Sequence, residues 1–90
     1  MIVARRYLVR GRVQGVGFRF FAEERARLDG VAGYVRNLPD GRVETLVEGD
    51  VEAVTRFERA IRHGPPGARV EEVETESLQP LGLQMFLIKS

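Results

Sequence analysis

The sequence of 90 residues contains no cysteine and only one histidine, His63. Without cysteine the chain forms no disulfide and offers neither a thiol nucleophile nor a cysteine metal site. The acidic residues between Glu71 and Glu76 fall in an expected strand, whereas a calcium loop of the EF-hand type needs carboxylates on a loop. We therefore expect no metal site and no cofactor.

Long apolar runs are also missing, since none approaches the ~20 residues that span a bilayer. Residues 1–11 lack the apolar core and small-residue cleavage site of a signal peptide. Charge of one sign does not dominate either: 14 basic residues face 13 acidic ones, for a formal net charge of +1. That balance argues against a general polyanion binder. We expect a cytoplasmic monomer made of one domain, residues 1–90, with no membrane and no nucleic-acid partner.

What the sequence does contain is a glycine-rich stretch, GRVQGVGFRF, from Gly11 to Phe20. Three glycines, Gly11, Gly15 and Gly17, lie between an alternating apolar segment and a segment of helical character. Glycines there allow positive φ and close approach of a ligand to bare backbone, and the N–H groups that open a helix favour an anion. Arg19, in about the first helical turn, adds a planar fork for two phosphate oxygens. The stretch indicates a phosphate cradle.

The spacing excludes the best-known nucleotide loops. A Walker A loop ends in Gly-Lys followed by Ser or Thr, and the dinucleotide fingerprint spaces its glycines as GxGxxG. Neither pattern is present, so nucleotide binding is not expected. On spacing alone, a plain tight turn before a helix stays open as an alternative.

The first half of the chain predicts a strand and a helix. Residues 3–13 alternate, with an apolar face formed by Tyr7, Val9 and Val13. The helix that follows carries most of its apolar residues on one arc, with Phe20 on the opposite side. That arc consists of Phe18, Phe21, Ala22, Ala26 and Leu28. Asp29 and Gly30 end this helix.

The second half predicts a hairpin, a helix and a strand. Residues 31–38 and 42–48 form the hairpin around a Leu-Pro-Asp-Gly turn. Asp50 is a good N-cap for a helix that Gly64, Pro65 and Pro66 stop. Residues 68–78 read as a charged edge strand with a bulge, because Val70 and Val73 fall on opposite faces. Residues 85–88 can add a last short strand.

This order of elements predicts an α+β fold. Two interleaved strand-helix-strand units give a ferredoxin-like βαββαβ sandwich, with an antiparallel sheet of four to five strands and two helices on one face. The fold alone does not decide the function, because this scaffold hosts many activities.

Two longer strings carry a resemblance to a known family. GRVQGVGFR at 11–19 and GYVRNLPDGRVE at 33–44 closely resemble acylphosphatase, and the similarity extends over the whole chain. The resemblance implies hydrolysis of acyl phosphates by Arg19, Asn37 and the loop before Arg19. The loop and Arg19 would bind phosphate and Asn37 would orient the attacking water. The loop residues are Gln14, Gly15, Val16, Gly17 and Phe18. The resemblance also leads us to expect Tyr34 in the core. Gly33, which has no side chain, is expected to admit close packing between strand and helix.

The chemistry of the substrate agrees with these parts. An acyl phosphate already has a good leaving group, a carboxylate, so no strong general acid is required. Charge neutralisation and positioning of an in-line water remain, as is usual in phosphoryl transfer. A charged hydrogen bond is worth roughly 1.5–3 kcal/mol, so one arginine and several amides can hold a dianion without a metal. We expect a small acyl phosphate as substrate, and inorganic phosphate or sulfate as alternative occupants.

Several alternatives stay open at this point. Arg19 can be one more solvated arginine, and Asn37 can merely initiate the turn through its side chain. A nucleic-acid or small-ligand module on the same fold would use a basic sheet surface, although the strand from Arg42 to Glu48 lacks the aromatics of an RNA-recognition sheet. That surface would comprise Arg5, Arg6, Arg10, Arg12, Arg36 and Arg42. A regulatory ligand-binding domain, or a domain like the one that opens a hydrogenase-maturation factor, is a further alternative.

Overall fold

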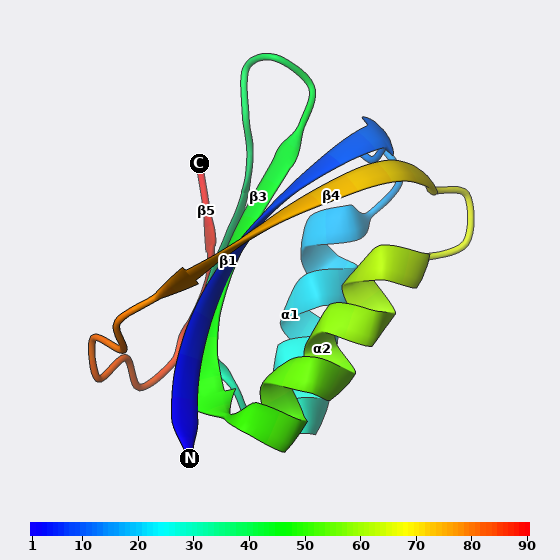
Figure 1. The fold of residues 1–90 in the computed structure, drawn as a ribbon. Helices are drawn as coiled ribbons and strands as arrows, with labels where there is room; N and C mark the ends of the chain where they lie inside the picture. Colours follow the sequence, from blue (N-terminus) through cyan, green and yellow to red (C-terminus); the bar gives the residue numbers. More distant parts are fainter.

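A computed structural model describes residues 1–90 as one sheet with two helices packed on one of its faces (Figure 1). The sheet has five strands in the order β4-β1-β3-β2-β5. The elements, in chain order, are β1 (Ile2–Arg12), α1 (Phe18–Asp29), β2 (Ala32–Asn37), β3 (Val43–Asp50), α2 (Val51–His63), β4 (Arg69–Leu78) and β5 (Phe86–Lys89). The predicted ferredoxin-like α+β fold is confirmed.

One strand departs from the antiparallel pattern. β1 to β4 pair antiparallel, as expected, but β5 runs parallel to β2 and makes the sheet mixed. The loop after β4 brings the chain around the end of the sheet, so that β5 enters beside β2 in the same direction. The direction of a short terminal strand depends on this return path, which the alternation of its four residues does not encode.

The predicted bulge in the edge strand is confirmed. Opposite Arg10 and Gly11 of β1 stand Glu72 and Val70 of β4, so Glu71 is the extra residue. The bulge lets Val70 and Val73 both pack against the core in spite of their odd spacing. Gly11 belongs to this contact and not to the anion loop, because a Cβ there would lie 2.1 Å from the Arg69 carbonyl oxygen.

α1 buries a narrower stripe than its sequence indicates. Phe18, Ala22 and Ala26 are buried, whereas Leu28, expected on the same arc, is exposed. The helix ends at Gly30, which is left-handed at φ 71° and donates its N–H to the Ala26 carbonyl oxygen. Leu28 lies in the last turn of α1, one residue before Asp29, the last helical residue, and its side chain stays outside the buried stripe.

α2 follows the prediction closely. The Asp50 side chain accepts a hydrogen bond from the Glu52 N–H at 3.1 Å and caps the helix. Val54, Phe57 and Ile61 are completely buried against the sheet. The apolar stripe at helical spacing therefore packs α2 on the sheet, on the same face as α1.

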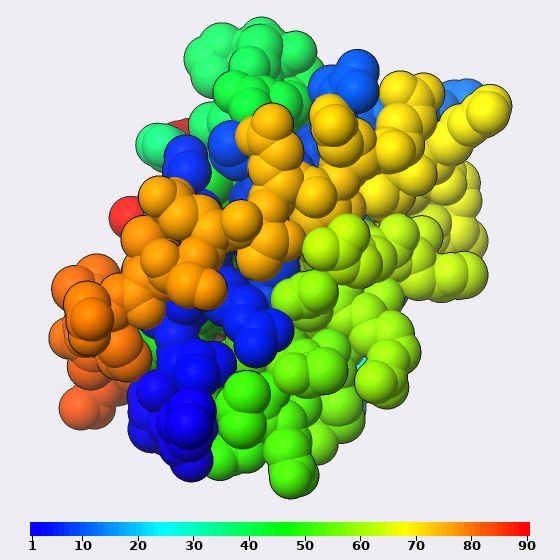
Figure 2. Space-filling view, in the orientation of Figure 1, coloured from blue at the N-terminus to red at the C-terminus, as the bar shows by residue number.

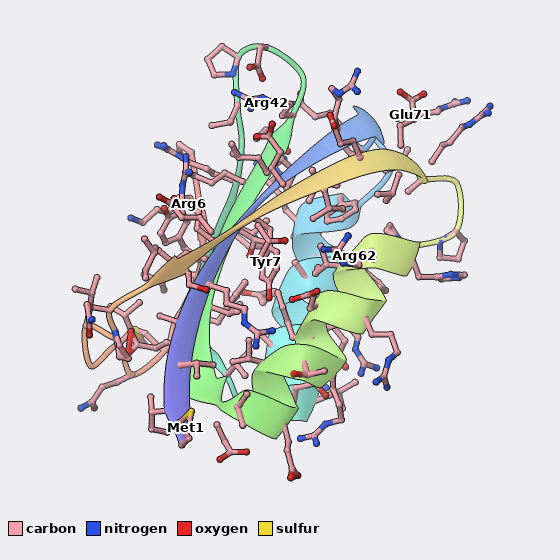
Figure 3. All side chains as sticks on the ribbon, in the orientation of Figure 1. Met1, Arg6, Tyr7, Arg42, Arg62 and Glu71 are labelled. Carbon is pink, nitrogen blue, oxygen red and sulfur yellow. The ribbon has the colours of Figure 1, made fainter.

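The two tyrosines differ in burial: one lies in the core and the other is partly exposed. Tyr7 is fully buried between sheet and helices, and its hydroxyl donates to Glu58 Oε1 at 2.9 Å (Figure 3). Tyr34, expected in the core, is only half-buried and lies under the Lys89 ammonium, 4.4 Å from the ring centroid. The expectation for Tyr34 is wrong because even-numbered residues of β2 face away from the helices.

Gly33 makes a close contact, though with a strand and not with a helix. It has φ 145°, and a Cβ there would lie 1.8 Å from the Leu46 carbonyl oxygen of β3. The glycine therefore lets β2 and β3 pair closely, and the prediction of a strand-helix contact is wrong.

Candidate active site

The loop between β1 and α1 has the backbone that the glycines predict. Gly15 has φ 75° and Gly17, the N-cap of α1, has φ 79°. Nothing lies within 4 Å of a Cβ built at either position, so the need for glycine there comes from the left-handed backbone and not from crowding. The open space above both glycines leaves the loop accessible to a ligand.

Free hydrogen-bond donors line this loop. None of the backbone N–H groups from residue 15 to residue 20 donates to an acceptor of the protein; the first N–H of α1 that does so belongs to Phe21, which donates to the Gly17 carbonyl oxygen at 3.0 Å. The amides before it include those of the first helical turn, where the helix dipole adds positive potential. This is the donor arrangement that an anion requires.

A small cavity of about 90 Å³ lies against the loop. It is formed where β1 ends, α1 begins and β2 ends, at the end of the molecule that carries the β2–β3 hairpin tip (Figures 1 and 2). The lining residues are Val13, Gly15, Gly17, Phe18, Arg19, Phe20 and Asn37. The structure thus brings Arg19 and Asn37, which are far apart in sequence, to one cavity.

Arg19 differs from most arginines of this chain. Nine of the thirteen arginines pair with a carboxylate within 4.0 Å, and Arg19 is not among them. Its half-buried side chain lines the cavity and keeps its guanidinium free of protein anions. A free guanidinium beside unpaired amides is suited to a phosphate dianion.

Asn37 is the last residue of β2, with its backbone opposite Val43. Its half-buried side chain makes no hydrogen bond within the protein. The turn is closed by other groups: the Gly41 N–H donates to the Leu38 oxygen at 3.1 Å, and the Arg42 N–H donates to Asp40 Oδ1 at 3.1 Å. The alternative that Asn37 initiates the turn through its side chain finds no support in these contacts.

Two residues of the predicted loop face away from the cavity. The Gln14 amide donates to the Leu38 oxygen at 2.8 Å and to the Arg42 oxygen at 3.0 Å, which ties the loop to the hairpin tip. Val16 packs against the hydrophobic core. Their side chains support the loop, and the Val16 backbone amide remains available to an anion.

Sequence reasoning missed two residues of the cavity wall. Val13 was expected only as part of an apolar strand face, and Phe20 only as a residue opposite the helix arc. For Phe20 the sequence does hold a signal, since an aromatic residue on the exposed side of a helix, next to Arg19, has no core to join.

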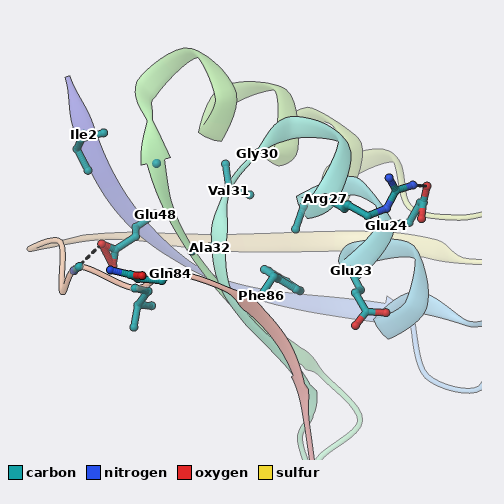
Figure 4. Close-up of a pocket in the computed structure, with 14 residues that line it drawn as sticks. Ile2, Glu23, Glu24, Arg27, Gly30, Val31, Ala32, Glu48, Gln84 and Phe86 are labelled. Atoms are coloured by element: carbon teal, nitrogen blue, oxygen red, sulfur yellow. Dashed lines mark hydrogen bonds and ion pairs between the residues drawn. The ribbon is translucent and has the colours of Figure 1, made fainter.

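The largest cavity lies elsewhere, at the other end of α1. It measures about 820 Å³ and is walled by Glu23, Glu24 and Glu48 together with Arg27 (Figure 4). The Glu48 carboxylate is buried and accepts hydrogen bonds from the Leu81 and Gly82 N–H groups at 3.0 and 2.8 Å. Three carboxylates make this cavity a poor place for a phosphate, so its size does not mark the active site.

The arginines of the sheet are largely neutralised. Glu44, which is buried, accepts hydrogen bonds from Arg6 Nε at 2.6 Å and Arg36 Nε at 2.5 Å. Burial would raise the pKa of Glu44, but these two hydrogen bonds and charges hold it below its ordinary value. Arg5, Arg10 and Arg42 also pair with carboxylates. Five of the six arginines proposed for a basic surface are thus paired, which disfavours a nucleic-acid interface; the absence of such a partner stays a prediction.

No helix of the structure is long and apolar enough to cross a membrane. No three His, Cys, Asp or Glu side chains gather in a group that could hold a metal ion.

Fold and cavity together define a class of protein: a small ferredoxin-like α+β domain with a glycine-rich loop of unpaired backbone amides at one end. A family model described as Acylphosphatase matches residues 5–88. An acylphosphatase of Deinococcus radiodurans is 48% identical over 81 residues, covering 90% of this chain and 93% of that one. The crystal structure of acylphosphatase from Bacillus subtilis matches with a TM-score of 0.94 and 40% identity over the full length of both chains.

The chain therefore belongs to the acylphosphatase family and is a hydrolase acting on acid anhydrides. Family membership supports hydrolysis of acyl phosphates as its activity. A crystal structure of full-length HypF in its phosphate- and nucleotide-bound form also matches all of this chain, with a TM-score of 0.89 and 28% identity, but over only 12% of that longer chain.

Proposed function

We propose that residues 1–90 act as one metal-independent acylphosphatase domain, in which the 14–18 loop and Arg19 bind phosphate and Asn37 orients the attacking water. The observation that carries this proposal is the cavity of about 90 Å³ that Arg19 and Asn37 share with Gly15 and Gly17. It holds an unpaired guanidinium, unpaired amides and an uncommitted carboxamide in one place. No other cavity combines these groups.

Phosphate binding follows from the donors. The loop amides and the dipole of α1 direct positive potential at the cavity, and Arg19 supplies a fork that matches two phosphate oxygens. A charged hydrogen bond contributes roughly 1.5–3 kcal/mol, so a few of them hold a dianion without a metal or cofactor. The same donors would accept inorganic phosphate or sulfate. As charge spreads over the equatorial oxygens in the transition state, these donors also stabilise it.

Asn37 would act on the water. Its carboxamide carries both a donor and an acceptor, so it can hold a water in line with the bond that breaks. The water oxygen forms the new bond to phosphorus, and the carboxylate leaves with the electron pair of the C(O)O–P bond. The proton of the water goes to the inorganic phosphate or to solvent. Because the carboxylate is a stable leaving group, no general acid is needed at the acyl end.

Hydrolysis of benzoyl phosphate in excess EDTA tests the proposal. The wild type should be active, and Arg19→Gln should lose phosphate affinity and turnover together. Arg59→Gln is the matched control, because Arg59 is also unpaired but lies exposed on α2, away from the cavity. A folded wild type without activity in EDTA, or a fully active Arg19→Gln variant, would contradict the proposal.

A further inference from the structure

The aromatic ring of Phe20 lies at the rim of the proposed active site and is not part of the core. The cavity has three apolar lining residues, Val13, Phe18 and Phe20. Val13 and Phe18 are buried members of the core cluster, whereas Phe20 is 67% exposed. Neither aromatic pair of the structure includes Phe20, since Phe18 pairs with Phe21 and Phe57 with Phe86.

This placement sets Phe20 apart from the other exposed apolar side chains. None of those lines the cavity with Arg19 and Asn37. They are Met1, Ile2, Leu28, Leu81, Leu83, Met85 and Leu87. Phe20 follows Arg19 directly on the first turn of α1, while the buried stripe of that helix faces the sheet. Phe20 therefore lines the same cavity as Arg19 and has most of its surface available to a ligand.

The size of the cavity determines which part of a bound acyl phosphate can contact Phe20. The cavity is small, at about 90 Å³, and its free donors are the loop amides and Arg19, so the phosphoryl group is the part of the substrate that fits it best. Once the phosphate oxygens are hydrogen-bonded to the amides and to Arg19, the acyl group of the bound substrate has to extend out of the cavity across its rim. Phe20 is the one apolar lining side chain that is exposed there.

We propose that Phe20 is a specificity-determining residue that contacts the acyl group, so that the site favours acyl phosphates with a flat apolar or aromatic acyl group over small ones. This inference rests on the proposed function. An aromatic acyl group can stack on the Phe20 ring or meet it edge-on, and both surfaces lose water on contact. An acetyl group is too small to cover the ring and gains little from it.

The test compares benzoyl phosphate with acetyl phosphate in the wild type and in Phe20→Ala. We expect kcat/KM for benzoyl phosphate to fall about tenfold, the effect of losing an aromatic contact and its buried area. For acetyl phosphate kcat/KM should change less than about twofold, and so should the inhibition constant of inorganic phosphate, since neither covers the ring. Leu28→Ala is the control, being an exposed apolar residue of the same helix outside the cavity.

The possible outcomes distinguish failure of this inference from failure of the proposed function. Equal losses for both substrates, or weaker inhibition by phosphate, would overturn it by showing that Phe20 supports the loop. An unchanged kcat/KM for both substrates would overturn it by showing that the acyl group extends from the cavity along another path, without contact to Phe20. A folded wild type that hydrolyses neither substrate would contradict the proposed function itself. A selective loss with benzoyl phosphate, restored in Phe20→Tyr, supports the inference.

Discussion

The Gln14 side-chain amide lies 2.8 Å from the Leu38 carbonyl oxygen and ties the glycine-rich loop to the hairpin turn that begins directly after Asn37. A second hydrogen bond, to the Arg42 oxygen, holds the other arm of the same turn. One residue thus connects the side of the cavity proposed to bind phosphate with the side proposed to orient the water. Their relative position does not rely on the sheet alone.

Gln14→Ala should therefore loosen the alignment of the two sides. We expect kcat to fall about tenfold or more, because small misplacements in phosphoryl transfer are costly. The inhibition constant of phosphate should change less, since the loop amides and Arg19 remain. Gln84→Ala, at an exposed position, serves as control. Unchanged kcat in a folded Gln14→Ala variant would show that the hairpin keeps its place without the link.

Gly17→Ala should damage both stability and phosphate binding. A side chain in the left-handed region costs roughly 1–2 kcal/mol, and any relaxation of φ would turn the amides away from the cavity. Gly67→Ala is the matched control, with φ 89° and nothing within 4 Å of its Cβ, in the loop before β4. Urea unfolding should show similar losses in both variants, while phosphate titration should weaken only with Gly17→Ala. Equal phosphate affinity in the two variants would show that the loop does not bind phosphate.

Gly33→Ala should destabilise the protein far more than Gly30→Ala. Both glycines have positive φ, but the new Cβ at position 33 would lie 1.8 Å from the Leu46 oxygen, while at position 30 nothing lies within 4 Å. Separation of β2 from β3 would break the hairpin that presents Asn37. Thermal unfolding of the two variants compares the effects, and equal melting temperatures would contradict the close approach of the strands.

Acid should weaken the fold through Glu44. Its pKa lies below the ordinary value of 4.5 because the hydrogen bonds and charges of Arg6 and Arg36 outweigh the effect of burial. A carboxyl group with a lowered folded pKa stabilises the protein above its unfolded pKa, and that contribution disappears as pH falls through the folded pKa. The free-energy gap between wild type and Glu44→Gln should thus be largest above the unfolded pKa of the carboxyl group and shrink as pH falls through the lowered folded pKa. Exposed Glu74→Gln is the control, and a gap independent of pH would contradict this role.

The sequence predicts the elements well where local patterns decide. The α2 stripe with its Asp50 cap, the Gly30 helix end and the bulge between Val70 and Val73 all follow from spacing and turn chemistry. Features that depend on contacts with a distant part of the chain cannot be predicted from such local patterns. The parallel pairing of β5 and the strand contacts of Gly11 and Gly33 require knowledge of which backbone lies opposite.

The site residues show the same difference between what local sequence patterns predict and what only the assembled fold shows. A glycine-rich turn followed by Arg19 indicates an anion loop from chemistry alone, whereas Asn37 enters through the resemblance, because one asparagine before a turn has many uses. The link from Gln14 to the hairpin and the rim position of Phe20 appear only when the loop, helix and hairpin are placed together. The roles of Arg19 and Asn37, the cytoplasmic location and the monomeric state stay predictions.

The most direct test of the account is to measure phosphate affinity and turnover separately in Asn37→Ala. The account predicts an inhibition constant for inorganic phosphate within about twofold of the wild type, because Arg19 and the loop amides are intact. It predicts a kcat for benzoyl phosphate at least about 100-fold lower, because the water loses its orientation. A folded Asn37→Ala variant that turns over benzoyl phosphate at the wild-type rate would contradict the assigned role of Asn37, and with it the proposed division of labour in the site.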